Sequence, residues 1–346
     1  MRTIFGISRM VWAGILAWGV VMGVQAGAEE RPGILGISHV AVRVSDVEKS
    51  VAFYRDFLGF AEEYRLYARN KDGKGTVPSS SKEDKGTDAR KGTVPFSSDE
   101  NRDSPRNENR DSPQDGALSM VVFKVNDDQC IQVSPGLKEG ENRLNHVAFQ
   151  VADAEAWRAY LAKQGIKTPA KVGRGQHKNA NFTIKDPDKF TIEFTEDTPE
   201  GWTVRDKGKF MPETRISGHI SHAGVVVADV PAALHFYGDI LGLKQTRRPT
   251  SSDDATARYN MILPGSDTGR ASGTHEYLEM MNATSGPHFC MDVPDVDKAK
   301  AKLEGSPYRP KYEKQIVQRV GKNGKRIVEV YAPDGIRVEF MENNAK

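Results

Sequence analysis

The sequence predicts an α+β fold built from four copies of one module, a strand followed by a helix and three further strands. Three observations carry this prediction. A chain of 346 residues is long enough for two domains. Residues 37–60 and 220–243 lie 183 residues apart and are identical at 12 of 24 positions. A weaker echo of the same pattern opens at residues 144 and 286, so each half of the chain holds two modules.

The main repeat begins as a strand and continues as a helix. In both copies polar and apolar residues first alternate, which is typical of a half-buried strand. Asp46 and Asp229 then stand where a helix N-cap is expected, and apolar residues follow at helical spacing. Gly59 and Gly242 can adopt the left-handed conformation that closes a helix. The two echoes repeat the alternating strand and its Asp cap, at Asp153 and Asp295.

Strand-like segments follow the helices and complete the modules. In the first and third modules they include residues 117–125, 130–134, 258–263 and 276–281. In the second and fourth modules, turn sequences with Pro and Asp precede the final strands at residues 190–195 and 336–341.

Three segments fall outside the repeat. Residues 1–28 combine two Arg, an apolar run and small residues, the pattern of a cleaved secretory signal peptide. We therefore expect an exported chain, periplasmic or secreted, without a stable membrane anchor. Residues 70–116 are rich in Lys, Asp, Ser, Pro and Asn and predict a disordered insertion. Residues 198–216 predict a linker between a first domain at 33–197 and a second domain at 217–343.

Composition excludes several classes of protein. The 49 Lys and Arg residues nearly balance the 47 Asp and Glu residues, which argues against a nucleic-acid partner. Cys130 and Cys290 lie 160 residues apart without the Cys/His spacing of a zinc site. Neither a disulfide framework nor a thiolate metal site is predicted, and both cysteines are interpreted as small interior residues.

The residues that could bind a metal ion lie on one face of the predicted sheets. Four of the eight histidines occupy the same place near the start of a module: His39, His146, His222 and His288. Strand parity puts each of them opposite the apolar, helix-covered face. The final strands carry Glu193 and Glu339 between apolar neighbours, and a half-buried carboxylate needs a cation or a donor. Matching strands add Gln132 and Glu279. Such nitrogen and oxygen donors suit a divalent first-row metal ion.

This order of residues resembles the vicinal oxygen chelate superfamily, which includes glyoxalase I, extradiol dioxygenases and bleomycin resistance proteins. The HxxxxVxD openings, the FYxDxLG helix ends, and the DPD or PDG turns before a Glu strand carry the resemblance. It covers nearly all of the predicted mature chain outside the insertion and the linker. It implies that the modules pair into two domains, each an incomplete barrel around a metal ion that binds two neighbouring oxygens of a small-molecule substrate.

The resemblance also implies two sets of metal ligands. The first set is His39, Gln132, His146 and Glu193, and the second is His222, Glu279, His288 and Glu339. One divalent ion, Zn, Ni, Mn or Fe(II), is expected in each functional domain. The leading interpretation is a metal-dependent isomerase or lyase that stabilises an enolate, with Glu279 or Glu339 as the catalytic base.

Several alternatives stay open. The chain could be an Fe(II) extradiol ring-cleaving dioxygenase, or a non-catalytic small-molecule binding or resistance protein. One domain could work while the other is degenerate, and the chain could form a homo-oligomer. Glu193 and Glu339 could instead form ion pairs with arginines, with Arg43 as the candidate partner in the first domain. His177 lies near the place of an extradiol acid/base histidine, but Thr183 stands where Tyr is expected. The other four histidines are expected at the surface or in loops: His177, His219, His235 and His275.

Overall fold

The computed structural model describes residues 30–68, 117–175, 177–247, 257–267, 275–282, 286–321 and 323–343. The predicted signal peptide and the predicted insertion at 70–116 lie outside the described residues. From Arg31 onward the chain forms one compact unit. Among the helices of the described part, none is both long and apolar enough to cross a bilayer.

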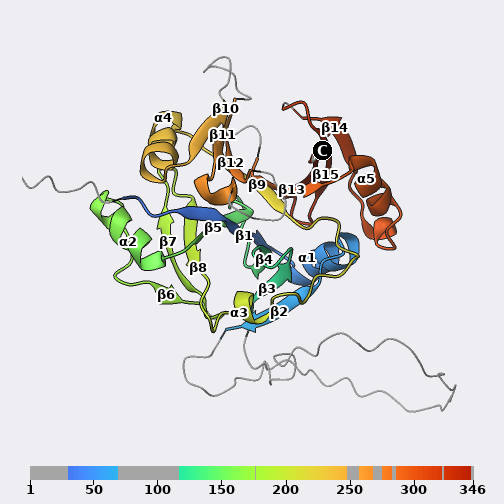
Figure 1. The fold of residues 1–346 in the computed structure, drawn as a ribbon. Coiled ribbons are helices and arrows are strands. Elements are labelled where there is room, and N and C mark those ends of the chain that lie inside the picture. Colours follow the sequence, from blue (N-terminus) through green and yellow to red (C-terminus); the bar gives the residue numbers. More distant parts are fainter. Residues whose placement is uncertain are drawn as a thin grey trace, which may run out of the picture. The chain divides into compact units, whose positions relative to one another are not determined.

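The first half of the chain forms an eight-stranded sheet in the order β2-β3-β4-β1-β5-β8-β7-β6 (Figure 1). The central strands β1 and β5 run antiparallel, and each has a parallel neighbour on its other side, β4 and β8. The strands are β1 (Ile34–Val44), β2 (Glu62–Tyr67), β3 (Leu118–Lys124), β4 (Cys130–Pro135), β5 (Leu144–Val151), β6 (Gly173–Arg174), β7 (Ala180–Lys185) and β8 (Thr191–Glu196).

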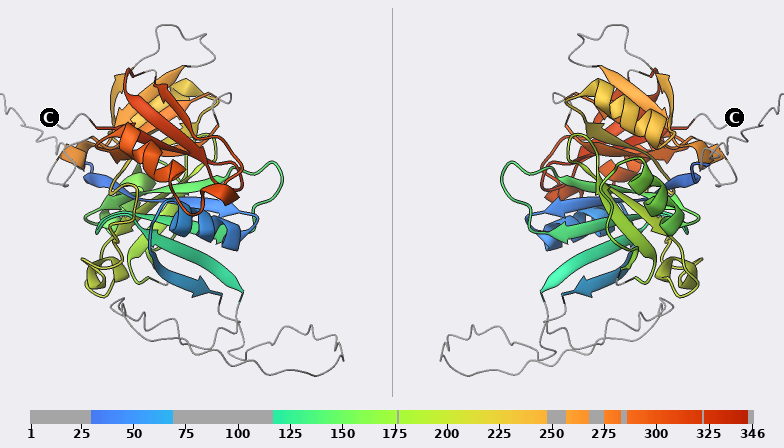
Figure 2. Two further views of the ribbon diagram at one scale, coloured as in Figure 1. Left: turned by 90° about the vertical axis from the view of Figure 1, so that its right-hand side faces the viewer. Right: turned by 90° about the vertical axis from the view of Figure 1, so that its left-hand side faces the viewer.

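The second half repeats this topology strand for strand. Its sheet has the order β10-β11-β12-β9-β13-β16-β15-β14, and Figure 2 shows both sheets curling around their inner faces. The two modules of each half therefore pair within the chain. The strands are β9 (Ile220–Val226), β10 (Lys244–Arg247), β11 (Arg258–Ile262), β12 (Tyr277–Met281), β13 (His288–Val293), β14 (Val317–Val320), β15 (Arg326–Tyr331) and β16 (Arg337–Glu342).

One helix follows the first strand of each module, as the repeat predicts. These helices are α1 (Val47–Ala52), α2 (Ala154–Lys163), α4 (Val230–Leu234) and α5 (Val296–Glu304). The side chain of the Asp before each helix accepts a hydrogen bond from a backbone N–H in its first turn, so all four predicted caps are confirmed. The prediction of four strand–helix–three-strand modules in an α+β fold is confirmed.

The helices of the first and third modules change their winding before they end. After α1 and α4 the chain continues as wider π-helical turns, Phe53–Phe57 and His235–Ile240, which the helical spacing did not predict. Gly59 and Gly242 then close the helices, both at φ +78°, as predicted.

The apolar faces of the strands pack beneath these helices. Val40, Val42 and Val44 are fully buried on the face of β1 opposite to His39 and Ala41. On α2, Trp157 lies 4.9 Å from the ring of Phe194 on β8, measured between ring centroids. The predicted parity of the strands therefore holds, and the polar positions face inward over the other side of each sheet.

The segment after the first sheet does more than connect the two halves. It contains the short helix α3 (Trp202–Arg205), and the ring of Trp202 packs edge-on against Tyr64 at 4.4 Å. The ammonium group of Lys124 donates to the backbone carbonyl of Asp206. Part of the predicted linker thus covers the first sheet, while the domain boundaries stay predictions.

Candidate metal centres

In each half, four adjacent strands present one candidate ligand each. In the first half β4, β1, β5 and β8 carry Gln132, His39, His146 and Glu193, respectively. In the second half β12, β9, β13 and β16 carry Glu279, His222, His288 and Glu339. Each set follows from the pleat, because every second residue of neighbouring strands points to the same inner face.

Three side chains converge in the first half. The Nε2 atoms of His39 and His146 lie 3.0 Å apart. The carboxylate oxygen Oε2 of Glu193 lies 3.2 Å from the Nε2 of His146 and 3.8 Å from that of His39. All three side chains are buried. We call this group the first-domain cluster; Gln132 lines the same pocket as His39.

The neighbours of the first-domain cluster are neutral. The amide of Asn181 donates to Oε1 of Glu193 at 3.0 Å, and Ser38 Oγ lies 3.4 Å from Nδ1 of His39. Among the described residues, no Lys or Arg pairs with Glu193. Burial lowers the pKa of His39 to about 3, so its imidazole is neutral at pH 7. The two imidazoles lower the pKa of Glu193 to about 2, against the effect of its burial, so its carboxylate is charged.

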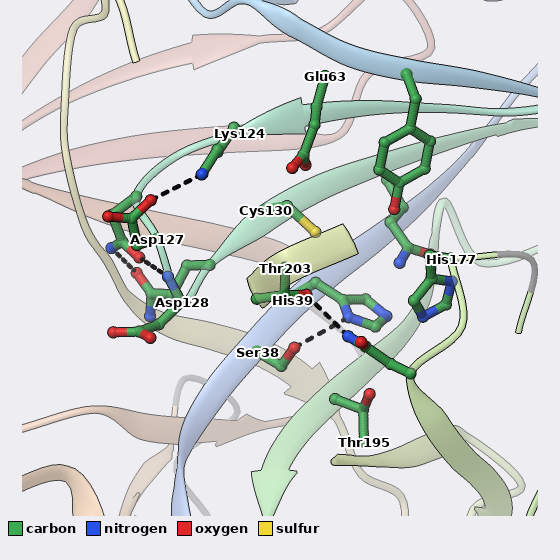
Figure 3. Close-up of a pocket in the computed structure, with 15 residues that line it drawn as sticks. Ser38, His39, Glu63, Lys124, Asp127, Asp128, Cys130, His177, Thr195 and Thr203 are labelled. Carbon is green, nitrogen blue, oxygen red and sulfur yellow. Dashed lines mark hydrogen bonds and ion pairs between the residues drawn. The ribbon is translucent and has the colours of Figure 1, made fainter. Parts of the chain in front are cut away.

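The pocket beside His39 also contains Glu63, which the sequence did not single out (Figure 3). His177 and Cys130 line it, together with Glu63 from β2. Burial raises the pKa of Glu63 to about 7, although the charge of Lys124 opposes this shift. The free volume is about 30 Å³, which is room for an ion with one or two water molecules.

The second half brings together four of the predicted residues. The Nε2 atoms of His222 and His288 lie 3.3 Å apart, and Oε2 of Glu339 lies 3.8 and 3.7 Å from them, respectively. Oε2 of Glu279 lies 3.5 Å from Nε2 of His288. The ring of His222 stacks on Tyr277 at 4.4 Å. We call this group the second-domain cluster; its pocket has a free volume of about 190 Å³.

Three arginines surround the second-domain cluster. Arg258 pairs with Oε2 of Glu279. Nε of Arg337 and Nη2 of Arg319 lie 3.2 and 3.5 Å from Oε1 of Glu339. Both of these guanidinium groups also pair with a third buried carboxylate, Glu329 on β15. Burial raises the pKa of Glu339 to about 7, against the effect of Arg337.

The two clusters differ in how well they fit a metal ion. Two nitrogens bound to one ion at about 2.1 Å lie roughly 3.0 Å apart in octahedral and roughly 3.4 Å apart in tetrahedral geometry, so the Nε2 spacings of both clusters suit one ion and the difference lies in their charges. The first-domain cluster combines two imidazoles with the charged carboxylate of Glu193, which pairs with no Lys or Arg among the described residues, so its residues fit a divalent ion. The donor atoms of the second-domain cluster converge too, but arginines already neutralise its carboxylates.

Of the histidines expected at the surface or in loops, His177 lies in a turn and His219 just before β9, but neither side chain is exposed. His177 lines the first-domain pocket. His219 is buried, with Nδ1 3.0 Å from Oδ2 of Asp292 and Nε2 3.1 Å from Oε1 of Glu276. Neither residue occupies a repeated histidine position, so the sequence pattern did not indicate where its side chain lies. His235 is exposed as expected and pairs with Asp239, and His275 is exposed.

Arg43, considered as a partner of Glu193, lies instead 3.8 Å from Glu141, measured from Nη1 to Oε2. The interpretation that a buried glutamate satisfies an arginine thus fits Glu339 and not Glu193.

The model of the Glyoxalase/Bleomycin resistance protein/Dioxygenase superfamily matches residues 36–194 and 219–340, most of the chain. The chain belongs to this superfamily. Its two matched segments coincide with the two eight-stranded sheets, so each half is one superfamily unit. The predicted membership, with two tandem domains of this type, is confirmed.

Two curated members of the superfamily resemble the chain in sequence. Glyoxalase I of Saccharomyces cerevisiae is 22% identical over 242 residues, which span 69% of this chain and 65% of that protein, just under two thirds of its length. Lactoylglutathione lyase of Schizosaccharomyces pombe is 23% identical over 341 residues, which span 88% of this chain and 96% of that protein.

Solved structures of the superfamily share the fold. A Mn(II)-bound glyoxalase from Novosphingobium aromaticivorans has a TM-score of 0.57 at 16% identity, over 90% of this chain and 83% of that one. An extradiol ring-cleaving dioxygenase from B. fuscum has the same TM-score and identity, over 90% of this chain and 73% of that one. At such identities the likeness shows the fold and leaves the reaction open.

Proposed function

We propose that the chain is a divalent-metal-dependent enzyme of the glyoxalase type, an isomerase or lyase acting on a small substrate with adjacent oxygens. The observation that carries this proposal is the first-domain cluster. His39, His146 and Glu193 bring two imidazole nitrogens and one carboxylate oxygen within 3.8 Å of one another. A buried carboxylate whose neighbours are neutral favours a cation as its missing partner.

The protein groups of this pocket suit proton transfer next to a carbonyl. A bound divalent ion supplies Lewis acidity, which stabilises negative charge developing on a substrate oxygen. Asn181 holds the carboxylate of Glu193 through Oε1, which leaves Oε2 facing the two imidazoles. Glu63 lines the pocket beside His39 with a pKa of about 7, a value suited to taking and returning a proton at neutral pH. The sequence-based expectation that Glu279 or Glu339 is the base concerns the second-domain cluster, and the reaction proposed here at the first-domain cluster does not use either residue.

The size of the pocket restricts the substrate. The cavity of about 30 Å³ beside His39 can take a small molecule, or the small reacting end of a larger one, in place of water. The names of the curated relatives, glyoxalase I and lactoylglutathione lyase, support a reaction at a two- or three-carbon unit with neighbouring oxygens.

The test is proton exchange in D2O. The metal-loaded chain is incubated with 2-hydroxy aldehydes, 2-hydroxy ketones and S-lactoylglutathione, and NMR follows deuterium uptake at the carbon next to the carbonyl. We expect exchange with at least one compound and its loss in Glu193→Gln. The matched control is Glu141→Gln, because Glu141 pairs with Arg43 at the surface. If no compound exchanges but one binds tightly, the chain is a binding protein instead.

A second candidate function is Fe(II)-dependent ring cleavage. Two histidines and one carboxylate form the ligand set of non-haem iron oxygenases, and His177 lies in the same pocket as a candidate acid or base. Oxygen uptake by the anaerobically Fe(II)-loaded chain, measured with a panel of catechols, tests this function. Ring opening that disappears in His177→Gln would replace the glyoxalase-type proposal.

We also propose that the chain is exported, because residues 1–28 have the pattern of a cleaved signal peptide. Fractionation of the native host, followed by mass measurement of the chain, tests this proposal. We expect a periplasmic or secreted chain that starts near Glu29. A cytoplasmic chain that retains residues 1–28 would contradict it.

A further inference from the structure

We propose that only the first-domain cluster binds a metal ion, and that in the second-domain cluster Arg258, Arg319 and Arg337 take the place of the cation. This inference rests on the proposed function in one respect, that the first-domain cluster is a metal site. It assigns a different chemical state to each half of a duplicated chain.

The first argument is the hydrogen bond between Arg337 and His288. Nη2 of Arg337 lies 2.9 Å from Nδ1 of His288. A guanidinium group can only donate, so Nδ1 of His288 accepts. A neutral imidazole that accepts at Nδ1 carries its proton on Nε2. That proton occupies the atom of His288 that faces His222, Glu279 and Glu339, so this nitrogen has no lone pair for a metal ion.

The first-domain histidines have neighbours that permit the opposite tautomer. Ser38 Oγ can accept a hydrogen bond from Nδ1 of His39. The side-chain amide of Asn145 lies 3.1 Å from Nδ1 of His146, and an amide can present its oxygen by turning through 180°. When an ion is bound beside Oε2 of Glu193, both Nε2 atoms can then direct lone pairs toward that ion; in the metal-free chain Nε2 of His146 hydrogen-bonds to Glu193. Metal-bound histidines commonly donate their other ring N–H in this way.

The strand register identifies the residue change that separates the two clusters. On β8 the residue paired with His146 is Thr191, whereas on β16 the residue paired with His288 is Arg337. The two positions are equivalent, two residues before the cluster glutamate in each strand. The hydroxyl of Thr191 accepts a hydrogen bond from Lys185 at 2.6 Å, outside the cluster. An arginine therefore enters the cluster in the second half only.

The charges lead to the same assignment. In the second half Glu279, Glu329 and Glu339 each pair with an arginine. A divalent ion added there would stand beside three guanidinium groups. Oε2 of Glu279, the oxygen nearest to His288, is itself held by Arg258. The first-domain cluster, in contrast, carries the unpaired charge of Glu193.

The primary test is metal stoichiometry in the full chain. The chain is loaded with Co²⁺, freed of excess ion, and analysed for cobalt per chain and for its visible spectrum. We expect one cobalt per chain, lost in Glu193→Gln and kept in Glu339→Gln. Thr191→Arg should weaken binding at least 10-fold, because it introduces the second-domain arrangement into the first. Circular dichroism establishes that each variant is folded.

Each other result overturns a stated part. Two cobalt ions per chain, or loss in Glu339→Gln with retention in Glu193→Gln, overturns this inference and leaves a metal-dependent enzyme in place. No cobalt in the unchanged chain overturns both this inference and the metal dependence of the proposed function. Unchanged affinity in Thr191→Arg removes the argument from Arg337.

The tautomers provide a measurement that does not depend on metal analysis or activity. Long-range ¹H–¹⁵N spectra of ¹⁵N-histidine-labelled chain distinguish protonation at Nε2 from protonation at Nδ1. His288→Gln and His146→Gln assign the signals. We expect His288 to be protonated at Nε2 with and without cobalt, and only the signals of His39 and His146 to shift strongly on loading. Protonation of His288 at Nδ1 would overturn the inference.

Discussion

The two halves of the chain place the same kinds of ligand on the same strands, yet surround them with different charges. In the first half the residue directly opposite Glu193 is Thr183, and in the second half the residue opposite Glu339 is Glu329. Thr191 and Arg337 differ in the same way. The backbone register therefore fixes which side chains meet, while their immediate neighbours decide whether the group needs a cation or already has one.

The same contrast extends to a buried triad beside the second-domain cluster. His219 lies between Asp292 and Glu276, and Glu276 also accepts a hydrogen bond from the backbone N–H of Ile37. In the first half the positions equivalent to Glu276 and His219 are Gln129 and Gly36. The second half thus holds ionised pairs in its interior where the first half is neutral, so the two halves should respond differently to substitution and to pH.

The largest expected effect is the difference in turnover between substitutions of the two cluster glutamates. Glu193→Gln should lower the turnover of proton exchange about 10³-fold, because it removes the charged ligand. Glu339→Gln should change turnover less than about 3-fold. Steady-state rates at saturating metal and substrate measure both. Equal losses in the two variants would show that both clusters act in the reaction, contrary to the contrast drawn between them.

A second prediction concerns stability and its pH dependence. The carboxylates of Asp292 and Glu276 raise the pKa of His219 to about 9, despite its burial. Because this folded-state pKa is above the ordinary value near 6.5, the stabilisation is complete below about pH 6.5. It is lost as the pH rises through 9. His219→Gln should cost about 3 kcal/mol at pH 7, since it leaves two buried carboxylates without their cation.

Urea unfolding at pH 6, 7, 8, 9 and 10 checks this second prediction. The unchanged chain should lose stability between pH 7 and 10 more steeply than His219→Gln does. His235→Gln is the matched control, because His235 pairs with Asp239 at the surface and should contribute little. Parallel pH profiles for the unchanged chain and His219→Gln would show that His219 is neutral in the folded chain.

The sequence predicted the fold almost completely because the repeated signals concern local backbone conformation. Alternation, Asp caps and glycine at the helix ends are local signals, and two copies confirm each other. The inward face of His39, His146, Glu193 and their counterparts followed from parity alone. The arginines could not be placed in this way: Arg258 reaches Glu279 from a neighbouring strand, and Arg319 reaches Glu339 from β14.

The inward positions of three pocket and core residues were not predicted, for related reasons. Glu63 is one of two adjacent glutamates, and nothing local tells which one points inward. His177 lies outside the strands, so parity does not apply to it. His219 precedes its strand by one residue, and its partners Asp292 and Glu276 are 73 and 57 residues away. Long-range pairing of this kind has no signature in a single sequence.

A third prediction compares the neighbours of the two cluster glutamates. Arg337→Thr should cost about 2 kcal/mol of folding stability, because Glu329 and Glu339 lose a charged partner. Asn181→Ala should cost about 1 kcal/mol, the value of one hydrogen bond to Glu193. Urea unfolding of the metal-free chain measures both. A larger cost for Asn181→Ala would mean that the first-domain cluster is the more strongly charged of the two.

The smallest expected effect on stability concerns one backbone position that differs between the two halves. Gly224 on β9 and Ala41 on β1 are equivalent, and they pair with His288 and His146, respectively. A Cβ atom at Gly224 would meet the imidazole of His288, so this ring lies against the backbone in a way that Ala41 does not permit for His146.

Gly224→Ala should therefore displace His288 and cost about 1–2 kcal/mol. Ala41→Gly should cost about 0.5–1 kcal/mol through backbone entropy alone. Urea unfolding measures both costs, and the histidine ¹⁵N spectrum should change at His288 in the first variant while His146 keeps its signal in the second. A stabilised Gly224→Ala chain with an unchanged His288 signal would show that the ring does not depend on this close approach.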